Sequence, residues 1–306
     1  MTTSDALLMP VRAPAGPAAW LRWGRGLIAF ARAKPLGALG GAVVTLLVVM
    51  AILAPVIQPY NPIATNQRAA LQAPDGAHLL GTDQFGRDIF SRVIQGARIS
   101  LYVGLGATSI SIVVALLIGV VSAYFGGVTD YFMQRLVDAV QAVPGLIMLI
   151  SVLVILGPSI TNVVLALAFR SSITTSRIVR GATLGILTNP YVEAAKVLGA
   201  QHARVMLRHV VPNIIPPVII VATVQFGGAI LAEASLSFLG YGVPPPTPSW
   251  GGMMSAEGRV YMIAAPWILI SPAVALSLVV FSVNVLGDAL RDRLDPRLRG
   301  GGGRMG

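Results

Sequence analysis

Few side chains of this sequence could carry out covalent chemistry. The chain has no cysteine, and its three histidines, His78, His202 and His209, lie far apart. Neither of its two lysines, Lys34 and Lys196, follows a glycine as a phosphate-binding loop requires, and the zinc-protease and serine-hydrolase signatures do not occur. The sequence therefore predicts a non-catalytic protein that binds no metal, ATP or other cofactor itself.

Two charged side chains, Arg170 and Glu233, fall inside long apolar segments. An ionised group within a bilayer costs free energy unless it faces a partner or a water-filled cavity. Two roles stay open for this pair. The side chains either pair internally, with each other or with backbone groups, and order the bundle, or they line a pathway through the membrane.

The composition indicates that a bilayer surrounds most of the chain. Of its 306 residues, 55% are apolar and 11% are charged, and the mean hydropathy is +0.77. Soluble domains have about 45–50% apolar and about 25% charged residues. The net charge of +10 comes from short basic patches between the apolar runs, which favours a topology signal over nucleic-acid binding.

Six segments are apolar enough to be membrane spans, so both termini should share one side of the membrane. With the N-terminus inside, sixteen basic residues lie inside and five outside, which predicts cytoplasmic termini. We expect a partly disordered cytoplasmic segment at 1–35, a first helix and outer leader at 36–100, a transmembrane core at 101–288 and a cytoplasmic tail at 289–306. The six predicted spans are 36–57, 101–125, 139–156, 160–175, 214–239 and 262–286.

The loop between the fourth and fifth spans has the pattern of an ordered helix. Asn189 can cap the helix, Pro190 suits its first position, and Glu193 complements the positive end of the helix dipole. The helix should reach Leu198 and break at Gly199. A second helical stretch should follow at 201–211 and end at the next proline.

The string at residues 189–212 resembles the EAA signature of ABC importer permeases. It has Glu193, Ala194 and Ala195, then Gly199 after three residues, and Pro212 at its end. In that family this loop is the coupling helix, which sits in a groove of the cytoplasmic ATPase. The resemblance implies that the ATPase docks on Tyr191, Val192, Glu193, Ala194, Ala195, Leu198 and Gly199.

Two outer segments narrow the resemblance. Residues 78–101 and 233–251 resemble the outer leader and last outer loop of the second permease subunit in dipeptide, oligopeptide and nickel importers. His209 and Val211, which replace Ile and Leu of the general signature, also agree with the peptide-importer branch. Thr82 or Asp83 should cap the helix before the second span. The residues that carry the leader motif are Gly81, Thr82, Asp83, Gly86, Arg87 and Asp88.

The resemblance implies an all-α membrane protein with six transmembrane helices, the type I ABC importer permease fold and a cytoplasmic coupling helix. It also implies a bacterial plasma-membrane location and several partners besides the lipid bilayer: a homologous second permease, two ATPase subunits or domains that bind ATP and Mg, and an extracytoplasmic solute-binding protein. Import of nickel or another small solute is an alternative. Two less favoured alternatives are an ion-coupled secondary transporter that uses Glu233 and Arg170 as its coupling pair, and a membrane scaffold.

Overall fold

The computed structural model describes residues 29–294, and within this range the elements are helices. The only strand-like pairing among these residues is an isolated bridge between Thr82 and Asp88. The disorder predicted for the first residues and for the glycine-rich tail concerns segments outside the described residues. The all-α fold class is confirmed.

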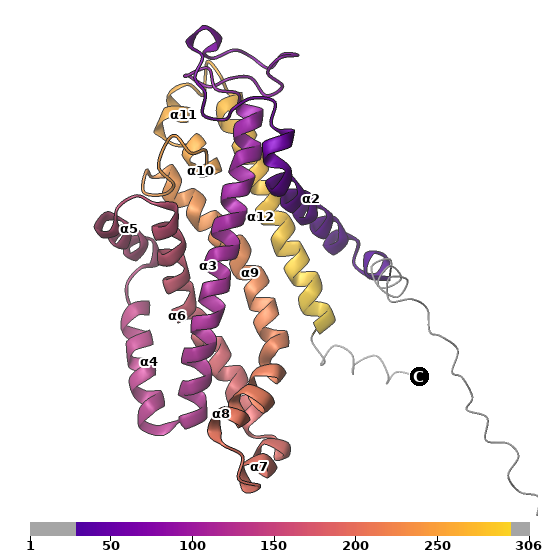
Figure 1. The fold of residues 1–306 in the computed structure, drawn as a ribbon, viewed down its shortest axis with the longest axis vertical. Helices are drawn as coiled ribbons and strands as arrows, with labels where there is room; N and C mark the ends of the chain where they lie inside the picture. The colour runs from indigo at the N-terminus through magenta and orange to yellow at the C-terminus, as the bar shows by residue number, and fades with distance from the viewer. Residues whose placement is uncertain (1–28, 295–306) are drawn as a thin grey trace, which may run out of the picture.

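Four described helices are long and apolar enough to cross a membrane (Figure 1). They are α2 (Pro35–Ile57), α3 (Ile89–Phe125), the continuous helix His202–Phe238 and α12 (Trp267–Leu294). The first of these agrees with the predicted span at 36–57. At 37 residues, α3 is about 55 Å long, so it extends well beyond the hydrocarbon core of about 30 Å.

The predicted span at 139–156 has the wrong bounds. Instead α4 (Gly127–Gln141) and α5 (Gly145–Leu156) form a pair bent by 87° at residues 142–144. Pro144 cannot continue α4, because it lacks a backbone N–H and its ring clashes with the preceding turn, and it occupies the N-cap position of α5. With 12 residues, α5 is about 18 Å long and cannot cross the bilayer alone.

The fourth predicted span is part of a longer helix, α6 (Ile160–Leu187), which continues three turns past residue 175. Arg170, Arg177 and Arg180 make it less apolar than the other long helices. The described chain thus has four strongly apolar spans, or five with the bent pair, against six predicted. α6 is not among these apolar spans, although it packs along α3 (Figure 1).

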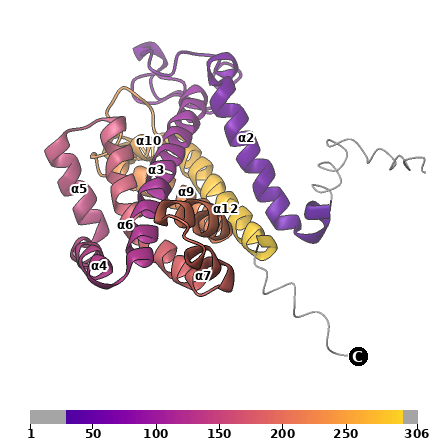
Figure 2. The same ribbon diagram turned by 60° about the horizontal axis from the view of Figure 1, so that its bottom comes forward.

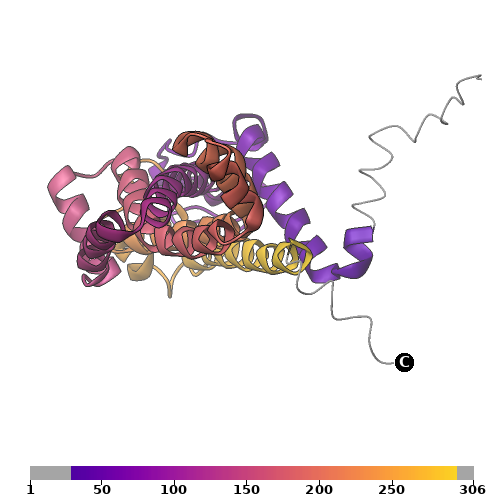
Figure 3. The ribbon, with the colours of Figure 1, turned by 90° about the horizontal axis from the view of Figure 1, so that it is seen from below.

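Close backbone contacts fix the first and last helices together. Gly40 on α2 faces α12, and a Cβ placed on it would lie 2.5 Å from the carbonyl oxygen of Ser282. An ion pair of 2.5 Å between Lys34 Nζ and Asp292 Oδ2 joins the start of α2 to the end of α12. Seen from below, α2 lies at one edge of the bundle and α5 at the opposite edge (Figure 3).

The loops gather at two opposite ends of the molecule. One end carries the leader with a short 3-10 turn (Gln67–Ala69), α10 (Trp250–Met253) and α11 (Ala256–Val260). The other end carries α7 (Pro190–Val197) and α8 (His202–Val205) (Figures 1 and 2). We call these the outer and inner ends.

Candidate functional site: coupling segment and outer cavity

The structure forms the predicted helix of the inner loop. α7 begins with Pro190, carries Glu193 in its first turn and ends at Val197. The chain then turns at Gly199, whose φ of +79° is in the left-handed region that glycine adopts without strain. Asn189 occupies the N-cap position, but its side chain donates to the carbonyl of Ile186 at 2.9 Å and so satisfies the end of α6 instead.

The exposed surface of this segment has large apolar side chains beside the charged side chains of Glu193 and Lys196. Val197 and Leu198 are 82% and 87% exposed, and Tyr191 is 43% exposed. Val192, predicted to contact an ATPase, is fully buried in the chain's own core, so its side chain is not part of the exposed surface. The reason is that α7 packs its Val192 side against the bundle. Glu193, Ala194 and Gly199 are exposed and Ala195 is half-buried.

The inner segment of residues 190–205, which we call the coupling segment, is held to the inner end of α3. The hydroxyl of Tyr124 lies 2.9 Å from Nδ1 of His202, and Lys196 Nζ lies 5.2 Å from the centre of the Tyr124 ring. Both contacts bring the start of α8 and the end of α7 onto a helix that spans the whole bundle. Tyr124 belongs to none of the sequence motifs, so the sequence did not indicate that it contacts the inner loop.

The second predicted helix does not end at Pro212. α8 passes into a π turn (Met206–Val210), and this turn continues directly into α9 (Val211–Phe238). The N–H of Val211 bonds to the carbonyl of Met206, five residues back. A proline lacks the N–H donor and crowds the preceding turn, and the wider π turn leaves room for it, so the helix need not stop.

At the outer end, Asp88 is the residue that caps α3. Its carboxylate accepts a hydrogen bond from the N–H of Ser91 at 2.8 Å and also contacts His78 Nδ1 at 2.9 Å. The prediction that Thr82 or Asp83 caps this helix is wrong, because α3 starts at Ile89. The hydroxyl of Thr82 instead donates to the carbonyl of Ala69.

Asp83 organises the leader motif. Its carboxylate pairs with Arg87 Nε at 2.6 Å and Arg92 Nε at 3.6 Å and accepts from the N–H of Phe85 at 2.9 Å. Gly86 has a φ of +69°, and a side chain there would collide with the carbonyl of Asn66. The predicted motif residues therefore meet in one compact turn that rests on the start of α3.

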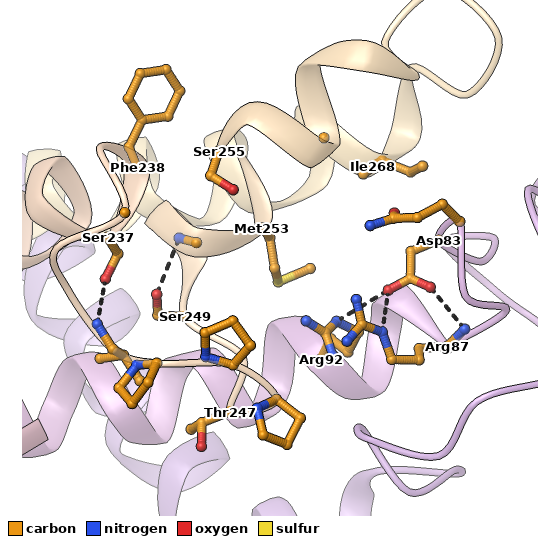
Figure 4. Close-up of a pocket in the computed structure, with 18 of the residues that line it drawn as sticks. Asp83, Arg87, Arg92, Ser237, Phe238, Thr247, Ser249, Met253, Ser255 and Ile268 are labelled. Atoms are coloured by element: carbon orange, nitrogen blue, oxygen red, sulfur yellow. Dashed lines mark hydrogen bonds and ion pairs between the residues drawn. The ribbon is translucent and has the colours of Figure 1, made fainter. Parts of the chain in front are cut away.

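This turn forms one wall of an outer cavity of about 500 Å³ (Figure 4). The opposite wall is the proline-rich loop after α9, and α10 and α11 close the third side. Arg87 and Arg92 face the cavity beside Asp83, and Arg259 lies at its edge with its guanidinium 4.8 Å from the Phe238 ring. The charged side chains that line the cavity carry an excess of positive charge.

Glu233 is fully buried near this cavity. Its Oε1 accepts a hydrogen bond of 2.6 Å from Ser237, whose hydroxyl in turn accepts from the N–H of Val243 at 3.0 Å. Its Oε2 is buried with no hydrogen-bond partner among the described residues. These contacts tie α9 to the outer loop. A Glu233–Arg170 pair does not form, since the ion pairs of the described residues do not include it.

Arg170 lies elsewhere, on the exposed side of α6 facing the bend between α4 and α5. Gly145, the first residue of α5, packs directly against its guanidinium, and any side chain at that position would collide with it. Arg170 and Glu233, which the sequence treats as one pair, thus belong to two separate environments.

Comparison with known proteins agrees with this architecture. Residues 115–300 match the family described as "Binding-protein-dependent transport system inner membrane component", and residues 25–74 match the "N-terminal TM domain of oligopeptide transport permease C". A crystal structure of an amino acid ABC transporter superposes with a TM-score of 0.51 over 67% of this chain and 95% of that one. At 18% identity this likeness shows the fold alone.

Several curated relatives cover most of the chain. The dipeptide transport system permease protein DppC of Haemophilus influenzae is 41% identical over 86% of this chain and 91% of its own length. The oligopeptide permease OppC of Bacillus subtilis is 38% identical over 90% of both chains. DppC of Alkalihalophilus pseudofirmus is 37% identical over 86% of both. The chain therefore belongs to the binding-protein-dependent transport system inner membrane components, the multi-pass permeases of ABC importers.

Proposed function

We propose that this chain is one of two membrane subunits that form the translocation pathway of an ATP-driven peptide importer. The relatives named as dipeptide and oligopeptide permeases support a peptide substrate. ATP and Mg bind to two partner ATPase subunits or domains, a homologous second permease supplies the other half of the pathway, and an extracytoplasmic binding protein delivers the peptide.

The coupling segment is the observation that carries this proposal. Val197 and Leu198 present apolar surface at the inner end of the molecule, while Val192 anchors the same short helix in the core. An exposed apolar surface on a rigidly held element is typical of a protein interface. Movement of a docked ATPase would reach α3 through Tyr124 and α9 through the continuous π turn.

The two ends of the molecule take opposite sides of a bacterial plasma membrane. The excess of basic residues in the inner loops supports a cytoplasmic inner end and cytoplasmic termini. The Lys34–Asp292 ion pair supports a shared side for the two ends of the chain. The outer cavity then faces the binding protein.

Transport by the reconstituted complex tests the proposal. We expect ATP-dependent uptake of a labelled dipeptide into proteoliposomes that hold both permeases, the ATPases and the binding protein. Leu198→Asp should reduce co-purification of the ATPases and uptake at least tenfold, because it places a charge in an apolar interface. Val128→Asp is the matched control, since Val128 is 72% exposed in the first turn of α4 and lies outside the coupling segment.

Three results would contradict parts of the proposal. Uptake that survives ATP depletion but stops when the proton gradient collapses would indicate a secondary transporter. Uptake of nickel without uptake of peptide would keep the ABC permease but change its substrate. Equal losses of ATPase co-purification and uptake in Leu198→Asp and Val128→Asp would show that the ATPase does not dock on α7.

A further inference from the structure

Arg170 is an exposed cation at membrane depth. It follows the start of α6 by ten residues, which places it about 15 Å from the outer end of a helix about 42 Å long. No carboxylate of the described residues pairs with it. A cation so placed faces either a partner group or a water-filled cavity.

The neighbouring backbone points to the water-filled cavity. Residues 141–144, where α4 breaks before α5, are exposed and non-helical over three positions, and Arg170 packs against Gly145 directly after them. The N–H groups of Ala142 and Val143 bond within the turn, to Asp138 and Val140, so the groups that the break leaves without a helical partner are carbonyl oxygens. Such groups at membrane depth are tolerated only where they are buried in protein or line an aqueous cavity. The broken helix and the unpaired cation thus indicate, independently of each other, the same polar surface.

Other polar groups continue this surface. Thr174 and Arg177 follow Arg170 on the exposed face of α6, one and two turns toward the inner end. Gln141 lies at the end of α4 and donates to the carbonyl of Ile173 at 3.4 Å. A small cavity of about 190 Å³ is lined by Arg170, Gln141 and Thr174 among others. Arg177 differs from Arg170 in that Asp138 already neutralises it.

We propose that Arg170 lines the translocation pathway and binds a carboxylate of the peptide as it crosses the membrane; this rests on the proposed function. A guanidinium binds a carboxylate through two parallel N–H donors, and no carboxylate of residues 29–294 forms an ion pair with Arg170. Gly145 is the positioning residue, because the absence of a side chain leaves room for the guanidinium at the bend.

The chain's lack of native cysteine allows a direct test. In the reconstituted complex, Arg170→Gln should lower peptide uptake at least tenfold while the binding protein still stimulates ATP hydrolysis, and Arg170→Lys should retain part of the uptake. The thiol of Arg170→Cys should react with water-soluble methanethiosulfonates. The trimethylammonium reagent should restore uptake several-fold and the sulfonate reagent should not. Ile52→Cys, on the exposed apolar side of α2, should stay unlabelled.

Substrate variation identifies the carboxylate. If Arg170 binds the C-terminal carboxylate, Arg170→Gln lowers uptake of trialanine and of a glutamate-containing tripeptide alike. If it binds an acidic side chain, only the second peptide is affected. Wild-type uptake by Arg170→Gln, an unreactive thiol, or equal rescue by both reagents would overturn the proposal. So would failure of Arg170→Gln to assemble, which would identify a structural ion pair with the second permease. Failure of the wild-type complex to import any peptide would instead contradict the proposed function.

Discussion

Glu233 and Arg170, the two ionisable side chains within apolar segments, lie in different environments. Glu233 is fully buried and accepts a hydrogen bond from Ser237 one turn along α9, and the Ser237 hydroxyl accepts from the N–H of Val243 in the outer loop. Arg170 is exposed and faces the bend of α4 and α5. Burial makes the first a structural group, whereas exposure at membrane depth requires something outside the chain's own core to solvate the second.

At Glu233, substitution by glutamine and substitution by alanine should differ in their effects on stability. Glu233→Gln keeps an acceptor for Ser237 and cannot carry a charge at this buried position, so the melting temperature should stay the same or rise. Glu233→Ala leaves a cavity and unpaired hydroxyl groups, and should cost about 1–3 kcal/mol. Thermal unfolding of the detergent-solubilised protein measures both. A Glu233→Ala variant as stable as the wild type would contradict the structural role.

Among the elements, the inner loop depends on the turn between α7 and α8. Gly199 supplies the positive φ, Val192 anchors one side, and the Tyr124–His202 contact anchors the other. Since the space around Gly199 is open, its requirement is for backbone conformation and not for a small side chain.

Gly199→Ala should therefore strain the turn by about 1–2 kcal/mol and reduce the peptide transported per ATP hydrolysed. Gly181→Ala is the matched control. A Cβ at either position meets no neighbour within 4 Å, but Gly181 is helical and has no positive φ. The ratio of uptake to phosphate release in proteoliposomes measures the effect. A similar ratio for the two variants would show that the turn does not transmit the movement.

For the whole molecule, the orientation in the membrane follows from the charges at its two ends. Leu198 lies at the inner end and is 87% exposed, and Leu79 lies in the outer leader and is 58% exposed. The inner loops carry the excess of basic residues, which predicts that they lie in the cytoplasm.

Thiol labelling should show this orientation. A membrane-impermeant maleimide should label Leu79→Cys on intact spheroplasts and Leu198→Cys only in inverted vesicles. The unsubstituted chain, which has no cysteine, should stay unlabelled and serves as the control. The reverse pattern would place the coupling segment outside the cell and contradict the proposed function.

The sequence by itself determined the membrane environment, the helical class, the family and the positions of the inner and outer motifs. These follow from local properties: apolar runs of bilayer length, the Pro190 start and Gly199 end of α7, and strings that match known permeases. Its errors fall where a local signal competes with packing. Pro212 reads as a helix end, but the π turn before it absorbs the proline.

Only the tertiary structure decided which side chains are buried and which charged side chains form ion pairs. It buried Val192, made Asp88 the cap of α3, and separated Glu233 from Arg170. It also broke the predicted third span beside Arg170. Burial and pairing depend on segments far apart in the chain, since Asp138 neutralises Arg177 from another helix while Arg170 on the same face keeps its charge available. No local pattern distinguishes those two arginines, because the difference lies in what α4 and α5 bring beside them.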